Sequence, residues 1–445
     1  MRDIGGTMSF FSEKIQVSFD GMLMAFSNAL NLVDSRLTDH HKQVAYICYE
    51  LAKSMGMDQD FIRKLVMLGL VHDMGAFREA ERDRMISFEV ENVMEHAVVG
   101  YLLLKKISFY EPMAEAILYH HTHYMDGENF HEVDPEIAMM AQLLFLADRV
   151  SVLAITSEHN VLAGVANIMV AIEEGSGELF NPIYVERMLS LKGSDYFWLN
   201  LMSDNKDKII QRIIIDSGEN LDLATFKEFT KMFVYSIDFR SRYTATHSIG
   251  VSIVAKELGK YCGMNEEEAE LLEIAGCFHD IGKLMVPFEI LDKPGRLTYD
   301  EYKLIRQHPY YTQYILERID GLDYINDISS RHHEFVDGGG YPYGLKNMAL
   351  STEAKLMTVA DIFTALTENR PYRDEASNEE VGHLFDKLVA SGKVDPDIAA
   401  TVTLHCEELH KINRQVQKEV VAEFTAMTNE KERLMAHLKA IEVVM

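Results

Sequence analysis

Apolar residues recur at intervals of three and four along much of the chain, which is the spacing of one face of an α-helix. From Glu267 to Phe278, for example, apolar side chains fall at positions 269, 271, 272, 274, 275 and 278. Asn265 followed by Glu268 has the pattern of a capping box, so we expect a helix to begin there and to end near His279-Asp280. Because only 9 of the 445 residues are proline, the pattern predicts an all-α protein.

The chain also repeats itself in order, at a distance of about 200 residues. The matching segments are Ser35–His41 with Ser241–His247 (offset 206), His72–Gly75 with His279–Gly282 (207), His96 with His308 and His120-His121 with His332-His333 (212), and Ala147-Asp148 with Ala360-Asp361 (213). The offset grows slowly and never reverses. A duplicated helical domain with a few loop insertions gives this behaviour.

We therefore divide the chain into five segments. They are an N-terminal tail (1–19), a first helical domain (20–190), a linker (191–221), a second helical domain (222–400) and a helical C-terminal extension (401–445). Polar runs around the apolar stretch from Ile209 to Ile215 indicate the linker. The extension lacks glycine and proline and predicts one or more long helices, which would pack on the first domain or support a homodimer.

The overall charge narrows the range of partners. With 43 basic and 70 acidic residues the net charge is −27, which opposes binding of a nucleic-acid polymer or an anionic membrane. An anionic substrate would then need a local cluster of metal ions, lysine and arginine. No signal peptide is evident, and charges such as Asp148 and Arg149 interrupt the apolar runs, so we predict a cytoplasmic protein.

The second domain contains seven residues of metal-ligand type in an ordered array. They are His247, His279, Asp280, His308, His332, His333 and Asp361. A single histidine on a helix is more often a core or surface residue, but an ordered set that recurs in the other domain favours a metal site. Imidazole and carboxylate suit iron, manganese or zinc, and a carboxylate such as Asp280 can bridge two ions.

Such a metal pair predicts hydrolysis of a phosphodiester, because it activates water near neutral pH and polarises a phosphoryl oxygen. Lys283, three residues after Asp280, could neutralise charge on the phosphate. Arg370 and Arg373 could form a second cationic group for phosphate. The structural alternative for each of the three is a solvated surface residue.

Three motifs of the second domain resemble those of the HD-GYP subgroup of the HD phosphohydrolase superfamily. They are His279-Asp280-Ile281-Gly282-Lys283, then His332-His333-Glu334 with Asp337-Gly338-Gly339-Gly340-Tyr341-Pro342, and Asp361 with Arg370-Pro371-Tyr372-Arg373. The resemblance implies an all-helical HD fold, a centre of two divalent metal ions, iron or manganese, and hydrolysis of cyclic dinucleotides in bacterial signalling. It implies cyclic di-GMP, opened to linear pGpG, as the first choice of substrate and cyclic GMP-AMP as the second.

The resemblance also implies roles for individual residues. The seven residues above would be the metal ligands, with Asp280 and Lys283 as catalytic residues. Contacts to substrate would come from Lys283, Gly340, Tyr341, Pro342, Arg370 and Arg373. Family members with three metals have a glutamate four residues before the first histidine, where this chain has Tyr243, so we expect two metals.

The first domain keeps the ligand types but not the residues for phosphate. Its candidate ligands are His41, His72, Asp73, His96, His120, His121 and Asp148. Ala76 stands where the second domain has Lys283, and no Gly-Tyr-Pro step or Arg-Pro-Tyr-Arg run follows. The domain is either a degenerate, regulatory copy, which we favour, or a second hydrolase of different specificity, and a structural or sensing metal is compatible with both.

Two alternatives to the phosphodiesterase remain open. One is a non-catalytic module that binds a cyclic dinucleotide and passes the signal to a partner. The other is an HD hydrolase of another nucleotide phosphate ester. The complete ligand set together with Lys283 favours the enzyme.

Overall fold

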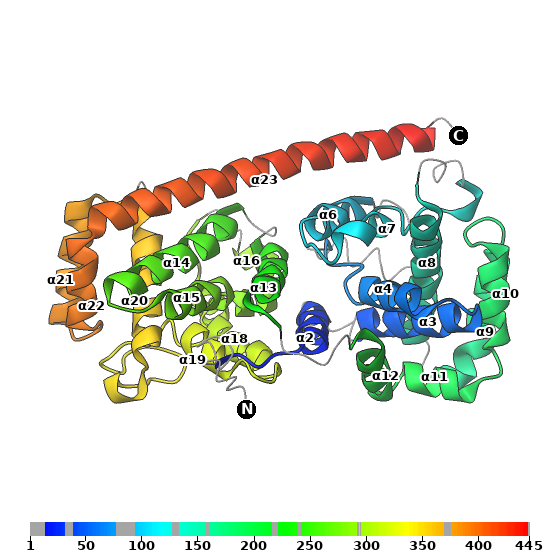
Figure 1. Ribbon diagram of the computed structural model, residues 1–445, viewed down its shortest axis with the longest axis horizontal. Helices are drawn as coiled ribbons and strands as arrows, with labels where there is room; N and C mark the ends of the chain where they lie inside the picture. Colours follow the sequence, from blue (N-terminus) through cyan, green and yellow to red (C-terminus); the bar gives the residue numbers. More distant parts are fainter. Residues whose placement is uncertain are drawn as a thin grey trace, which may run out of the picture. The chain divides into compact units, whose positions relative to one another are not determined.

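The computed structural model describes residues 14–31, 39–76, 94–126, 133–156, 160–215, 221–238, 242–291, 293, 295–368 and 375–443. It divides into two compact units (Figure 1). The first unit comprises Phe19–Glu219 with Met427–Met445, and the second comprises Asn220–Ala426 with Met1–Ser18. The described residues form helices and no β-strand, so the predicted all-α class is confirmed.

The first unit is built from ten α-helices and one 3-10 helix among the described residues. They are α2 (Phe19–Asn31), α3 (His40–Ser54), α4 (Gln59–Gly69), α6 (Met94–Leu104), η2 (Glu111–Met113), α7 (Glu115–Leu118), α8 (Pro135–Thr156), α9 (Val161–Glu174), α10 (Pro182–Ser190), α11 (Asp195–Leu201) and α12 (Asn205–Ile214). Helix α3 lies at the centre of this unit, where it packs against α4, α8 and α12 (Figure 1).

The second unit repeats this plan with further helices. They are α13 (Leu223–Asp238), α14 (Arg242–Tyr261), α15 (Glu266–Phe278), η4 (Ile281–Met285), α16 (Phe288–Leu291), α17 (Tyr299–Ile305), α18 (His308–Leu316), α19 (Asp323–Ser329), η5 (Asn347–Ala349), α20 (Thr352–Thr367), α21 (Asn378–Ala390), α22 (Pro396–Leu404) and the part of α23 (Cys406–Val443) up to Ala426. Helix α14 packs along α15 and α20, as α3 packs along α4 and α8 (Figure 1).

Local signals in the sequence explain where the central helix α15 begins and ends. The Asn265 side chain accepts a hydrogen bond from the Glu268 N–H, and the Glu268 side chain accepts one from the Asn265 N–H, so the predicted capping box is confirmed. The helix ends at Phe278 with His279 as its C-cap. The His-Asp pair therefore lies at the helix end, as predicted.

Matching glycines allow helices to touch backbone to backbone in both units. A Cβ on Gly69 would lie 2.8 Å from the Ala45 Cα, and one on Gly276 would lie 2.5 Å from the Ser252 Cα. Both pairs are related by the same offset of 207 residues. The repeat seen in the sequence is therefore a repeat of helix packing, and the predicted duplication is confirmed.

The predicted linker, residues 191–221, is wrong as a description of the structure, because it contains α11 and α12. Both helices bury apolar side chains in the first unit, among them Phe197, Trp198 and Ile210. Of the polar runs that suggested a linker, residues 203–207 lie at the start of α12, where the Lys206 side chain is buried. Only residues 216–220 of this segment lie outside the described residues.

The two chain ends also belong to the units. Residues 1–13 of the predicted tail lie outside the described residues, whereas Ile15 and Val17 are buried in the second unit. The Val17 carbonyl accepts a 2.8 Å hydrogen bond from the Leu221 N–H. In the predicted extension, α23 is one helix of 38 residues, and the unit boundary falls between Ala426 and Met427.

Helix α8 is the one described helix that is long and apolar enough to cross a membrane. In the structure, 78% of its most apolar window is buried, and it carries Asp148 and Arg149. The core helix of a folded protein passes the same test of length and composition as a membrane-spanning helix. The cytoplasmic location stays a prediction.

Candidate metal centres

The His-Asp pair of the second unit lies where α15 gives way to η4. The His279 side chain is fully buried and Asp280 is 3% exposed. The carboxylate of Asp280 points two ways: Oδ1 lies 3.2 Å from His308 Nε2, and Oδ2 lies 3.1 Å from His279 Nε2. A single carboxylate therefore lies between two groups of histidines.

Asp361 on α20 has a similar position on the other side. Its Oδ1 is 3.1 Å from His247 Nε2, and its Oδ2 is 3.6 Å from His333 Nδ1. The ligand-type atoms of His308, His332 and His333 form one group within 4.8 Å of one another, and those of His247, His279 and Asp280 form another. The structure thus brings together all seven residues that the sequence analysis singled out.

Backbone carbonyl groups fix the ring orientation of three of these histidines. The Nδ1 of His279 bonds the Gly276 carbonyl at 2.6 Å, and the Nδ1 atoms of His308 and His332 bond carbonyls three residues earlier at 2.7 Å. Because a carbonyl only accepts, each Nδ1 must carry the proton. In the neutral ring, Nε2 then presents a lone pair to the centre of the cluster.

These lone pairs need a cation. The Nε2 atoms of His308 and His332 lie 3.0 Å apart, and two bare lone pairs at that distance repel each other. The buried Nε2 of His279 has no hydrogen-bond partner in the described part of the chain. Imidazole and carboxylate are suitable ligands for divalent transition metals, so the residues fit a metal centre.

Burial keeps the ring nitrogens available at neutral pH. It is the main cause that lowers the pKa of His308, His332 and His333 to about 3, and neighbouring imidazoles lower the pKa of His332 and His333 further. Burial alone would raise the pKa of Asp280, but His279 and Lys283 beside it hold this pKa well below its usual value. At neutral pH, His308, His332 and His333 are therefore uncharged and Asp280 is ionised, which suits the binding of a cation.

His247 differs from these histidines, because its Nδ1 atom bonds a side chain and not a backbone carbonyl. Its Nδ1 donates to Glu368 Oε2 at 3.3 Å, and Glu368 is 3% exposed. Burial alone would lower the pKa of His247, but the carboxylates of Glu368 and Asp361 raise it to about 10. Sequence reasoning missed Glu368, although it stands only seven residues after Asp361, as the C-cap of α20.

The loop after the histidine pair is held by a second buried carboxylate. Glu334 is 1% exposed and accepts hydrogen bonds from the N–H groups of Tyr343 (2.7 Å), Gly344 (3.2 Å) and Leu345 (2.8 Å). A Cβ on Gly340 would lie 2.5 Å from the His333 carbonyl oxygen, so only glycine lets the loop approach the histidines this closely. The Tyr341-Pro342 peptide bond in this loop is cis.

The accessible side of the cluster combines aromatic and cationic groups. The Tyr341 ring lies 4.8 Å from the His333 ring, and the Arg306 guanidinium lies 4.4 Å from the Tyr341 centroid. Lys283 Nζ is 2.5 Å from Asp280 Oδ2. The side chains of His333 and Lys283 are 29% and 18% exposed, so solvent reaches the cluster here.

Two predicted substrate contacts, Arg370 and Arg373, lie outside the described residues. Arg306 was not predicted, although it stands two residues before His308 in the sequence. Its guanidinium adds a cation beside the Tyr341 ring.

The first unit builds a similar cluster, with one correction to the prediction. The inward histidine is His40 and not His41: His40 Nε2 lies 3.4 Å from Asp73 Oδ2 and 3.2 Å from Asp148 Oδ1. His41 is turned toward Asn31, which bonds its Nδ1 at 2.8 Å. The sequence comparison aligned His41 with His247, whereas the offset of 207 that the packed glycines share pairs His247 with His40.

The remaining candidates of the first unit gather as well. Its two groups are His40, His72, Asp73 and Asp148, and Asp73, His96, His120 and His121. They share Asp73. In the second unit, Asp280 belongs to one group and its Oδ1 lies 3.2 Å from His308 Nε2 of the other. The Ala76 N–H bonds the Asp73 carbonyl at 2.9 Å, as the Lys283 N–H bonds that of Asp280, so alanine occupies the position of the lysine.

An arginine, Arg149, follows Asp148 in the sequence, whereas none follows Asp361, the equivalent residue of the second unit. The buried Arg149 donates to Asp148 Oδ2 from Nη2 at 2.6 Å and from Nε at 3.1 Å. Asp148 therefore turns only Oδ1 to the cluster. In the second unit Ile362 follows Asp361, and both oxygens of Asp361 face histidines.

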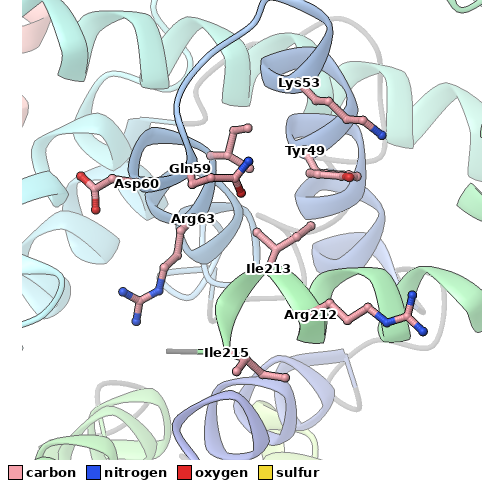
Figure 2. Close-up of a pocket in the computed structure, with 9 residues that line it drawn as sticks. Tyr49, Lys53, Gln59, Asp60, Arg63, Arg212, Ile213 and Ile215 are labelled. Carbon is pink, nitrogen blue, oxygen red and sulfur yellow. The ribbon is translucent and has the colours of Figure 1, made fainter. Parts of the chain in front are cut away.

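A separate pocket of about 610 Å³ lies on the first unit between α3, α4 and α12 (Figure 2). Lys53, Arg63 and Arg212 line it together with Tyr49 and Gln59. In Figure 2 the Arg63 head points to the opposite side from those of Lys53 and Arg212. The charges do not converge on one point, so this pocket does not compete with the clusters as a phosphate site.

Comparison with known families agrees with the duplicated fold. Two family models, both described as HD domain, match residues 37–153 and 230–398. The solved structure of the cyclic GMP-AMP specific phosphodiesterase V-cGAP3 of Vibrio cholerae has a TM-score of 0.59 at 20% identity. The match covers 88% of this chain and 98% of that one, and it supports the fold.

Two relatives with assigned activities illustrate the range of similarity. The chain is 29% identical over 427 residues to 3'3'-cGAMP-specific phosphodiesterase 1 of Vibrio cholerae. The matched region covers 92% of this chain and 97% of that protein. It is 35% identical over 155 residues to the cyclic di-GMP phosphodiesterase response regulator RpfG of Xanthomonas campestris, which covers 33% of this chain and 40% of that protein.

Proposed function

The chain belongs to the HD-domain family, and from this premise we propose that its second domain is a metal-dependent phosphodiesterase of cyclic dinucleotides. One observation carries the proposal: Asp280 lies between two histidine groups and has Lys283 at 2.5 Å. The lysine supplies the positive charge that a phosphate needs and that the first unit lacks at Ala76.

We propose two divalent ions, iron or manganese, held by the seven clustered residues. Support comes from Asp280, whose two oxygens lie 3.1 Å from His279 Nε2 and 3.2 Å from His308 Nε2, and from Tyr243, which stands four residues before His247 in place of a further acidic ligand. Ions bound there would polarise a phosphoryl oxygen and lower the pKa of water.

The residues around the cluster would bind and orient the substrate. Lys283 would neutralise a non-bridging phosphate oxygen and the charge that develops on the leaving oxygen. Tyr341, backed by Arg306 and His333, offers a ring on which a base can stack, and Gly340 and Pro342 shape the wall below it. Arg370 and Arg373 are proposed as further phosphate contacts. Water would add across one P–O bond, which opens the ring to a linear dinucleotide.

We favour cyclic GMP-AMP over cyclic di-GMP, which reverses the order expected from the sequence. The relative named for cyclic GMP-AMP matches 92% of this chain, whereas RpfG, named for cyclic di-GMP, matches 33%. Base recognition depends on pocket shape rather than on the metal ligands, so turnover must decide.

The test is anaerobic reconstitution of the full chain with Fe²⁺ or Mn²⁺, followed by chromatography of the products from each dinucleotide. We expect a linear dinucleotide from cyclic GMP-AMP. Lys283→Ala should lower kcat about 100-fold or more with the metal content unchanged, and Asp280→Ala should remove metal and turnover together. Lys303→Ala, at an exposed position, is the matched control.

Tight binding of both dinucleotides without any cleavage would favour a non-catalytic binding module. Cleavage of neither, with turnover of another nucleotide phosphate ester, would change the substrate but keep the site. The predicted homodimer and the predicted lack of nucleic-acid and membrane partners stay predictions.

A further inference from the structure

The two clusters differ in the side chain that hydrogen-bonds the Nδ1 atom of an equivalent histidine ligand, His247 in the second unit and His40 in the first. In the second unit the carboxylate of Glu368 accepts the Nδ1–H of His247. In the first unit the equivalent ring, His40, has its Nδ1 3.0 Å from the neutral hydroxyl of Ser151. Position 155, which matches Glu368 in the repeat, is isoleucine.

The equivalent carboxylates of Asp148 and Asp361 also differ in their partners. Arg149 occupies Oδ2 of Asp148 with two donors, and both residues are at most 2% exposed. Asp361 has no such partner next to it in the chain, and its two oxygens face His247 and His333. Asp148 can therefore offer one oxygen where Asp361 can offer two.

Both differences change the affinity for a cation in the same direction. A carboxylate that accepts from the outer nitrogen of a histidine makes the ring a stronger ligand. A guanidinium that holds a carboxylate withdraws electron density and one oxygen from an ion. Apart from Lys283, which lies on Asp280 where the first unit has Ala76, the ligand sets are alike, so Glu368 and Arg149 are the groups behind the ligands that distinguish the clusters.

We infer that Glu368 and Arg149 are positioning residues that set unequal metal affinities, so that the second-unit cluster binds divalent ions more tightly than the first-unit cluster. At limiting metal, the second unit then fills while the first stays empty. The inference rests on the proposed metal-dependent function and assigns each unit a place in the order of loading.

The test is a titration of the metal-stripped full chain with Mn²⁺, in which free Mn²⁺ is counted by electron paramagnetic resonance. Asp73→Ala confines binding to the second unit, and Asp280→Ala confines it to the first. We expect binding at least about tenfold tighter in the Asp73→Ala chain. Glu368→Gln in that chain should weaken binding about 10- to 100-fold.

In the Asp280→Ala chain, Arg149→Ile copies the residue after Asp361 and should tighten binding about tenfold or more. Arg149→Lys keeps the charge and should leave binding weak. Circular dichroism checks that each variant is folded. If Arg149→Ile does not fold, Glu368→Gln and the comparison of the two backgrounds decide the question.

Equal affinities in the two backgrounds, or a folded Glu368→Gln variant within about threefold of its parent, would overturn the inference. Loss of the proposed function looks different. In that case the Asp73→Ala chain, with its second unit intact, would show no saturable Mn²⁺ binding at all.

Discussion

Replacing Glu334 by glutamine tests whether a buried carboxylate holds the loop beside the histidine pair. The carboxylate accepts three backbone N–H groups, two at Oε1 and one at Oε2. Glutamine keeps one oxygen, which can serve Tyr343 and Gly344. Its amide nitrogen would then face the Leu345 N–H, donor against donor.

The cost follows from these contacts. One charge-assisted hydrogen bond is lost, at about 1.5 to 3 kcal/mol, and one buried donor is left without an acceptor, at about 1 to 3 kcal/mol. The sum is about 2.5 to 6 kcal/mol, which for a unit of this size lowers Tm by roughly 5 to 24 °C. If the loop detaches instead, the Tm changes less and the wall at Tyr341 is lost.

Differential scanning calorimetry and steady-state kinetics separate these cases. We expect a lower Tm for the second unit, or a KM for the cyclic dinucleotide raised about tenfold, with bound metal unchanged. Glu407→Gln, at an exposed position of α23, is the matched control and should change neither. A Glu334→Gln enzyme with wild-type Tm and wild-type KM would refute the reasoning.

Three further predictions concern other parts of the second unit. Gly282→Ala places a Cβ 1.9 Å from the His308 carbonyl oxygen, so it should cost about 3 kcal/mol or more in urea unfolding, whereas Gly263→Ala, strained only by its φ of 90°, should cost about 1 kcal/mol; equal costs would contradict the close packing. Tyr341→Ala should raise KM more than it lowers kcat, while Tyr341→Phe should stay near wild type; the reverse order would assign the phenol hydroxyl a chemical role. The metal-free protein should lose stability on acidification, because the folded-state pKa of His308, His332 and His333, about 3, lies below the unfolded value. This stability is present above about pH 6.5 and is lost as pH falls, by about 2 kcal/mol per histidine at pH 5, and His247, whose pKa is raised to about 10, does not offset it below pH 6.5. Equal unfolding free energies at pH 7 and pH 5 would contradict the buried neutral rings.

The sequence predicted the duplicated helical fold because its signals are local or ordered. The capping box at Asn265 and the paired His-Asp steps need no knowledge of tertiary contacts. The seven clustered residues could be singled out for the same reason, although their role as ligands stays a prediction.

The sequence did not predict in which direction a side chain points, or which residues distant along the chain contact each other. His40 and His41 are neighbours, and only their tertiary contacts, with Asp73 and Asp148 for His40 and with Asn31 for His41, distinguish the ring that turns inward. Glu368 and Arg306 act through space on His247 and Tyr341. The predicted linker was wrong because this segment forms two short helices in which polar residues alternate with buried ones such as Trp198 and Ile210.

The carbonyl groups that fix the histidine rings also limit how these domains can evolve. A point mutation replaces a side chain but leaves the main-chain carbonyls of Gly69, Ile117, Gly276, Ile305 and Ser329 in place. The ring orientation of these five histidines is thus insensitive to mutation of their neighbours. His40 and His247 are oriented by the side chains of Ser151 and Glu368 instead, so natural selection can adjust metal binding at these positions while every ligand is retained.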